Sequence, residues 1–198
     1  FIMFRFIFPI LIAISFPLEV LSGQFGLEVG ETKESIQKKG VRLIESESYW
    51  YRTNKLPKGN SQLNNYSLLI TPISGLCRIV GRTESIETNS FGTQLISKFE
   101  FFETALNKRY GQGEKYDFVK SGSIWDDEKY WMMGLYQKER YLTSIWDKEK
   151  DNLPNHLNYI ALDTHARTTG EGVISLNYEF INTAKCYEEQ DAADTDNL

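Results

Sequence analysis

The sequence has few of the residues that most often carry catalytic and metal chemistry. Its 198 residues include only 2 histidines, 2 cysteines and 5 prolines. The two cysteines, Cys77 and Cys186, lie too far apart in sequence for a CxxC redox or zinc motif. The glycines form neither a phosphate-binding loop nor a dinucleotide-binding fingerprint. We therefore predict no cofactor and no metal site.

Positive charge is also scarce. The chain has 22 Lys and Arg against 27 Asp and Glu, which gives a formal net charge of −5. Domains that bind nucleic acids are usually basic, so we expect no nucleic-acid partner. A polybasic patch for a membrane surface is not expected either. Membrane attachment is predicted only if the N-terminal segment described next is retained.

Long apolar runs are confined to the N-terminus. Residues 1–18 are almost wholly apolar with a single charge, which is typical of a signal-peptide core and short for a membrane span of about 20 residues. Pro9 and Pro17 interrupt this run and Glu19 follows it, which favours a cleaved signal peptide over residues 1–23. The predicted location is therefore secreted or periplasmic. The alternative is an envelope protein anchored by an uncleaved N-terminal helix.

The rest of the chain is long enough to form one ordinary domain. Residues 24–187 are assigned to a single α+β domain. Its halves, 24–89 and 90–187, are candidates for two helix-plus-sheet units, although they share no sequence period. Residues 188–198 are acidic, small and polar, which predicts a disordered tail. In an oxidising compartment Cys77 and Cys186 are candidates for a disulfide, and two unpaired thiols are the alternative.

Two segments carry helix signals. Thr32 is suited to cap a short helix over residues 33–39, which Gly40 would end. A longer helix is predicted by one apolar stripe at helical spacing. The stripe consists of Leu95, Phe99, Phe102, Leu106 and Tyr110. We expect this helix to lie on a sheet with its phenylalanines inward.

Alternating apolar residues predict antiparallel strands on both sides of the longer helix. The clearest hairpin joins residues 159–167 to residues 174–180, with one buried side and one solvent-facing side. Residues 130–137 and 141–146 are interpreted as another hairpin, with a helix over 127–139 as the alternative. The predicted fold class is α+β, with antiparallel sheet packed against one long and one short helix, in a single or a tandem helix-plus-sheet arrangement.

The start of the predicted domain resembles a known family. Residues 26–40, GLEVGETKESIQKKG, combine a short strand, a glycine, a threonine cap, a helix and a closing glycine. This order is similar to the opening of bacterial exported domains related to the β-lactamase inhibitor protein and to the small outer-membrane-assembly lipoproteins. The resemblance implies an exported α+β module that binds other proteins rather than catalysing a reaction. The lipoprotein members have a cysteine at the cleavage site, and this chain lacks it.

Aromatic residues are plentiful, with 12 Phe, 11 Tyr and 4 Trp. Tyrosine and tryptophan suit half-exposed sheet faces and binding surfaces, and a β-rich core is the alternative explanation. The candidate binding residues are Tyr49, Trp50, Tyr51, Trp131, Trp146 and Tyr159. If several of them share an open sheet face, the chain is a non-catalytic module that binds another protein.

One residue pair supports an enzymatic alternative. Asp163 and His165 lie on the same side of a predicted strand, about 7 Å apart, where the carboxylate could orient the imidazole as a general base. No serine or cysteine nucleophile motif lies beside them. Asp163 and His165 are thus weak catalytic candidates for a hydrolase-like function.

Overall fold

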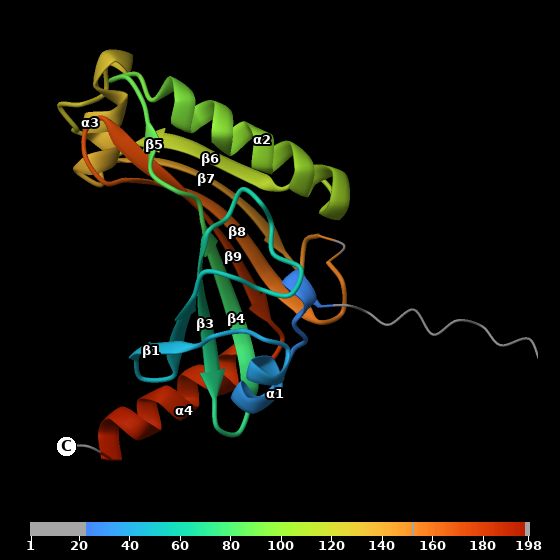
Figure 1. Cartoon of the computed structure of the whole chain (residues 1–198). Helices are drawn as coiled ribbons and strands as arrows, with labels where there is room; N and C mark the ends of the chain where they lie inside the picture. The colour runs from blue at the N-terminus through green and yellow to red at the C-terminus, as the bar shows by residue number, and fades with distance from the viewer. Residues whose placement is uncertain (1–22, 152, 197–198) are drawn as a thin grey trace, which may run out of the picture.

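The structure is a computed structural model that describes residues 23–151 and 153–196 (Figure 1). The predicted signal peptide therefore lies outside the described residues, except for residue 23. In chain order the elements are η1 (Gln24–Gly26), α1 (Lys33–Lys38), β1 (Ile44–Glu47), β2 (Trp50–Thr53), β3 (Asn65–Thr71), β4 (Gly75–Arg82), β5 (Ile86–Glu87), α2 (Thr93–Tyr110), β6 (Glu114–Val119), η2 (Glu128–Tyr130), α3 (Trp131–Tyr136), β7 (Arg140–Asp147), β8 (Leu157–Ala166), β9 (Glu171–Phe180) and α4 (Thr183–Asp196). The strands form one nine-stranded antiparallel sheet, which confirms the predicted α+β class.

The sheet is built from two consecutive meanders. Strands β1 to β4 pair in chain order, strands β6 to β9 pair in chain order, and β5 adds to β9. The last strands of the two meanders, β4 and β9, pair antiparallel, with Ile79 opposite Tyr178. Helix α1 precedes the first meander and α2 precedes the second. The tandem arrangement is thus one continuous sheet whose halves meet at a shared central strand pair.

Helices α1 and α2 follow from the predicted sequence signals. The Thr32 hydroxyl accepts a 3.2 Å hydrogen bond from the Ser35 backbone N–H, which caps α1 as expected. The five residues of the apolar stripe in α2 are all buried. They pack against β8 and β9 in the main core, so α2 lies along one face of the sheet (Figure 1). Across the described part of the chain, no helix combines the length and the apolar character that a membrane span requires.

The segment before β7 is helical rather than extended. Trp131, Met132 and Leu135 are buried within α3, a spacing that places them on one side of a helix. The predicted strand over 130–137 is therefore wrong, and the alternative helix is correct for residues 131–136. The residues of α3 complete the main core at the end of the sheet where α2 begins.

Helix α4 packs on the opposite face of the sheet from α2, across the β3–β4 hairpin. Cys77 and Cys186 form a disulfide with their Cα atoms 6.4 Å apart. The Thr183 hydroxyl donates a 2.7 Å hydrogen bond to the Cys77 carbonyl oxygen. The prediction of a disordered tail over 188–198 is wrong as far as residue 196. The tail is helical because the disulfide and the Glu189 carboxylate, which accepts hydrogen bonds from the hairpin turn, fasten it to the sheet.

The hairpin of β8 and β9 departs from simple alternation. On β9 the side predicted to face solvent is covered, with Ser175 and Asn177 each only 5% exposed. Strand β9 lies in the middle of the sheet, and the Arg78 guanidinium on β4 donates a 2.8 Å hydrogen bond to Asn177. The predicted solvent-facing side is seen on β8, where Asp163 is half-buried and His165 is exposed.

Candidate functional site

The face of the sheet opposite α2, here called the polar face, is the candidate binding surface. Strand register places Arg52, Ser67 and Asn177 in one row across it, and Arg82, Ser175 and Asp163 in the next. Helix α4 covers this face over β3 and β4. Over β6, β7 and β8 no helix of the described chain packs on it (Figure 1). The polar face is therefore open along half of the sheet.

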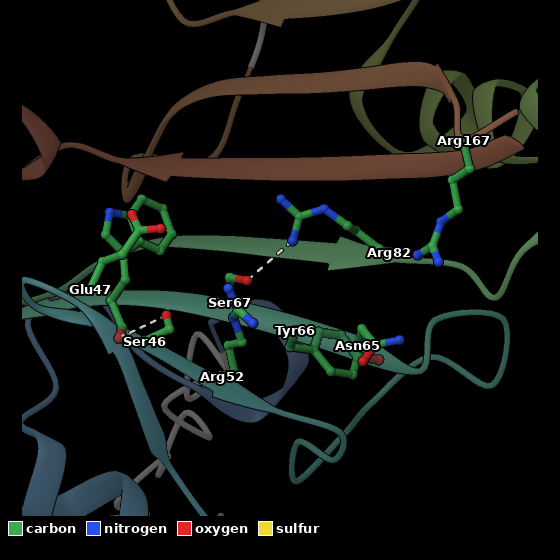
Figure 2. Close-up of a pocket in the computed structure, with 9 residues that line it drawn as sticks. Ser46, Glu47, Arg52, Asn65, Tyr66, Ser67, Arg82 and Arg167 are labelled. Carbon is green, nitrogen blue, oxygen red and sulfur yellow. Dashed lines mark hydrogen bonds between the residues drawn. The ribbon is translucent and has the colours of Figure 1, made fainter. Parts of the chain in front are cut away.

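One part of the polar face is hollowed, and we call this part the arginine hollow (Figure 2). Its volume is about 580 Å³. It is lined by Ser46, Glu47, Trp50, Arg52, Asn65, Tyr66, Ser67, Arg82 and Arg167. The three arginines come from separate segments, since Arg52 lies on β2, Arg82 ends β4 and Arg167 directly follows β8.

Backbone pairing positions each arginine of the hollow. Arg52 is opposite Ser67 in the β2–β3 pair, and Arg82 is opposite Ser175 in the β4–β9 pair. The Arg167 backbone N–H donates a 2.8 Å hydrogen bond to the Glu171 carbonyl oxygen, which fixes the start of the β8–β9 turn. Figure 2 shows Arg82 directed toward Ser67. The Nη1 of Arg82 donates a 3.1 Å hydrogen bond to the Ser67 hydroxyl.

The charge in the hollow is not balanced by ion pairs. Within residues 23–151 and 153–196, none of its three arginines forms a salt bridge, whereas the neighbouring Arg78 pairs with Glu179 at 3.4 Å. Desolvation, followed by repulsion from Arg52, Arg78 and Arg167, lowers the pKa of the Arg82 guanidinium. Glu47 is the acidic residue among those that line the hollow. A local excess of positive charge thus exists in a chain of net charge −5.

The other part of the polar face, over β6, β7 and β8, is aromatic, and we call it the aromatic end. Phe118 on the edge strand β6 stacks on Tyr141 of β7, with ring centroids 5.0 Å apart. Tyr116 is 37% exposed and Phe118 is 48% exposed. Sequence reasoning did not select these three residues. The signal that could have found them is the alternation of Tyr116 and Phe118 with charged neighbours in a six-residue strand.

Acidic groups surround Tyr159 at the aromatic end. Desolvation, and then the charges of Asp163, Glu179 and Asp147, raise the pKa of the Tyr159 phenol to about 12. Asp163 accepts a 2.8 Å hydrogen bond from the Thr143 hydroxyl. Carboxylates therefore gather around Tyr159, while Lys120 lies over the Tyr141 ring, 5.4 Å from its centroid.

The structure does not bring the six predicted binding aromatics together. Tyr51, Trp131 and Trp146 are buried in the main core, which corrects the prediction that they share an exposed surface. Tyr49 and Trp50 pack against the buried cluster around the disulfide and remain partly exposed. Tyr159 is partly exposed on the polar face of β8. Trp50 lines the arginine hollow and Tyr159 lies nearer the aromatic end.

Asp163 and His165 share the polar face, as strand parity predicted. Desolvation lowers the pKa of the His165 imidazole, the Asp163 carboxylate opposes this, and Arg82 reinforces it. In the described part of the chain no hydroxyl or thiol group forms a hydrogen bond with the His165 ring, while Asp163 is bonded to Thr143. The described residues also contain no group of three or more His, Cys, Asp or Glu side chains placed to hold a metal ion.

Comparisons with known proteins found no relative of this chain. No protein-family model matches the chain, and no match was found among curated proteins or among solved structures.

Proposed function

We propose that this chain is a non-catalytic binding protein that recognises another protein through the aromatic end of its polar face. The observation that carries the proposal is the exposed Phe118 ring, which stacks on the half-buried Tyr141 on an uncovered part of the sheet. Aromatic side chains supply large contact area at a small entropic cost and are enriched where proteins bind tightly. The aromatic end therefore has the composition of a contact surface.

The edge of the sheet supports the same proposal. Strand β6 is the last strand in the sheet order and pairs only with β7 among the described strands. Its outer N–H and C=O groups are available to a further strand, and its residues are almost all exposed. Addition of a partner strand to such an edge is a recurrent mode of protein recognition. A partner could pair with β6 while it contacts Tyr116 and Phe118.

The charge of the aromatic end indicates the chemistry of the partner. Asp147 lies opposite Tyr159 in the β7–β8 pair, and Asp163 lies in the row of Thr143 and the exposed Tyr116. Complementary charge steers association and suppresses wrong partners. We therefore expect the partner to present a basic surface.

The compartment is part of the proposal. The Cys77–Cys186 disulfide is typical of oxidising compartments. The apolar run at residues 1–18 and the resemblance of residues 26–40 to exported binding modules support a secreted or periplasmic location. If the signal peptide is cleaved, N-terminal sequencing of the mature protein should begin close to residue 24. A mature chain that retains residues 1–23 would instead support the anchored alternative.

A photo-crosslinking experiment tests the contact surface. A benzoylphenylalanine is placed at position 118 of the full chain expressed in its native host, and the same group at Phe101 serves as a matched control. Phe101 is 57% exposed on α2, on the other side of the sheet. We expect irradiation to give a discrete protein adduct from position 118 and none from position 101. Tyr141→Ala should abolish that adduct, because it removes the ring that supports position 118.

Three results would overturn the proposal. The first is the absence of any adduct from position 118, and the second is the same set of adducts from positions 118 and 101. The third is an adduct from position 118 that survives both Tyr141→Ala and Tyr116→Ala. Thermal unfolding of each variant shows whether the domain remains folded, because Tyr116, Phe118 and Tyr141 lie outside the main core.

A further inference from the structure

We propose that the arginine hollow binds the doubly charged phosphate group of a small organic phosphate monoester, with the body of that molecule against Trp50. The hollow lies over β2, β3 and β4 and the turn after β8, away from the aromatic end. It would remain a ligand site whether or not a protein binds at the aromatic end. The inference therefore stands separately from the proposed function.

The arginine side chains of the hollow have unused hydrogen-bond donors. Among the described residues, the side chains of Arg52 and Arg167 form no hydrogen bond or ion pair, and Arg82 uses only Nη1, toward Ser67. Each guanidinium presents five N–H donors in a planar fork that matches phosphate oxygens two at a time. The three arginines come from β2, β4 and the end of β8 and line the same hollow, where the Arg82 guanidinium is directed toward Ser67 (Figure 2). An oxyanion in that space can be bound from several sides.

The positive charge of the arginine hollow is not balanced by carboxylates. Arg52, Arg78 and Arg167 all lie close enough to repel the Arg82 guanidinium, and only Arg78 has a carboxylate partner, Glu179. Like charges held together oppose folding unless an anion offsets them. The carboxylate of Glu47 lines the same hollow and accounts for one negative charge at most. Three guanidinium groups against one carboxylate leave an excess that matches a dianion.

The size and the lining of the hollow suit a small organic molecule. A volume of about 580 Å³ lies within the range of about 300–1,000 Å³ that is usual for small-molecule sites. The Ser67 hydroxyl and the Asn65 amide add neutral polar groups for hydroxyl or carbonyl groups of a ligand. The partly exposed Trp50 ring supplies a flat apolar wall. The lining thus suits a charged head group attached to a sugar or aromatic body.

Calorimetric titration with three probes tests the proposal. The probes are phenyl phosphate, phenyl sulfate and benzoate, added to the full mature protein in phosphate-free buffer at physiological salt. We expect saturable binding of phenyl phosphate at one site, with phenyl sulfate and benzoate at least about tenfold weaker, because they carry a single charge. Equal affinity for all three probes would overturn the assignment to a phosphate dianion, and so would no saturable binding of phenyl phosphate.

Arginine variants locate the site. Arg52→Gln, Arg82→Gln and Arg167→Gln should each weaken phenyl phosphate binding about tenfold or more. Arg42→Gln, at an exposed arginine that does not line the hollow, changes the net charge equally and should leave affinity within about twofold. Arg82→Lys keeps the charge but loses the planar fork, so its effect should be intermediate. If Arg42→Gln weakens binding as much as the other three, binding reflects general charge and the site is rejected.

Discussion

The indole Nε1 of Trp146 donates a 2.8 Å hydrogen bond to the carbonyl oxygen of Gly111. This bond joins a fully buried residue of β7 to the C-terminal end of α2. The same ring lies so close to Gly113 that an added Cβ there would be 2.5 Å from Cε2 of Trp146. Trp146 therefore closes the space between helix and sheet and is a core residue rather than a binding residue.

Truncation of Trp146 should strongly destabilise the domain. We expect Trp146→Ala to lower the free energy of unfolding by about 3–5 kcal/mol, because a large buried ring is lost. Trp146→Phe should cost less, since it keeps an aromatic ring and loses only the hydrogen bond to Gly111 and some packing. Urea denaturation measures both losses. Phe118→Ala, at an exposed ring, is the control. If Phe118→Ala lowers the free energy of unfolding as much as Trp146→Ala does, Trp146 is not a special core residue.

A second aromatic contact gives a matched pair of glycine substitutions. Gly92 precedes α2 with φ +70°, and an added Cβ would lie 2.2 Å from Cε3 of the buried Trp131. Gly122 has φ +81° with nothing within 4 Å of an added Cβ. Gly122→Ala should cost only the left-handed backbone strain of about 1–2 kcal/mol. Gly92→Ala should cost clearly more by the same denaturation assay, and similar losses would show that Trp131 can move aside.

The disulfide should contribute strongly to stability. Cys77 and Cys186 are separated by 109 residues, a loop whose closure is worth at most ~4–5 kcal/mol in the chain-entropy model. We expect reductant to lower the midpoint of guanidinium unfolding and to speed amide hydrogen exchange in α4 before the rest of the domain. The double variant Cys77→Ala with Cys186→Ala should show no response to reductant. Rapid exchange throughout the domain upon reduction would mean that α4 does not open separately.

Acid should weaken the attachment of α4. Burial opposes ionisation of the Glu189 carboxyl, but hydrogen bonds from Ser74, Ile73 and Thr71 outweigh it and lower its pKa below the ordinary value of 4.5. A carboxyl with a lowered pKa in the folded state adds stability above its unfolded pKa and loses it as the pH falls through its folded pKa. The attachment should therefore be complete at neutral pH and weaken as the pH drops below 4.5.

NMR measures this titration directly. The amide proton shifts of Ile73 and Ser74 should follow the protonation of Glu189, because both amides donate to its carboxylate at 3.0 and 2.9 Å. Glu189→Gln should remove that transition and raise the mobility of α4 at neutral pH. Glu188→Gln changes the charge equally at the exposed neighbouring position and should leave the transition in place. Loss of the transition in both variants would point to a different group.

Hydrophobic periodicity correctly predicted the elements that bury their side chains on a single side. The stripe from Leu95 to Tyr110 is buried as predicted because α2 has the sheet on a single side. The sequence did not show that Tyr51, Trp131 and Trp146 belong to the core, because tryptophan and tyrosine occur both in cores and on binding surfaces. Composition also misled at the C-terminus, where a disulfide and polar contacts rather than an apolar stripe hold α4 in place.

The arginine hollow could not be predicted from sequence. Arg52, Arg82 and Arg167 meet only because β2, β3, β4, β9 and β8 are neighbours in that order. A shift of one residue in any pairing would send one of these side chains to the opposite face. Such register depends on contacts between distant segments, and no local pattern around the three arginines specifies it.

The pairing of β4 with β9 has a consequence for the order of events during synthesis. Ile79 meets Tyr178, so one border of the first meander stays without its neighbour until β9 has been made. An exposed border of this kind invites mispairing with other chains. We therefore expect the first meander to be open to such mispairing until the β8–β9 hairpin is available to complete the sheet.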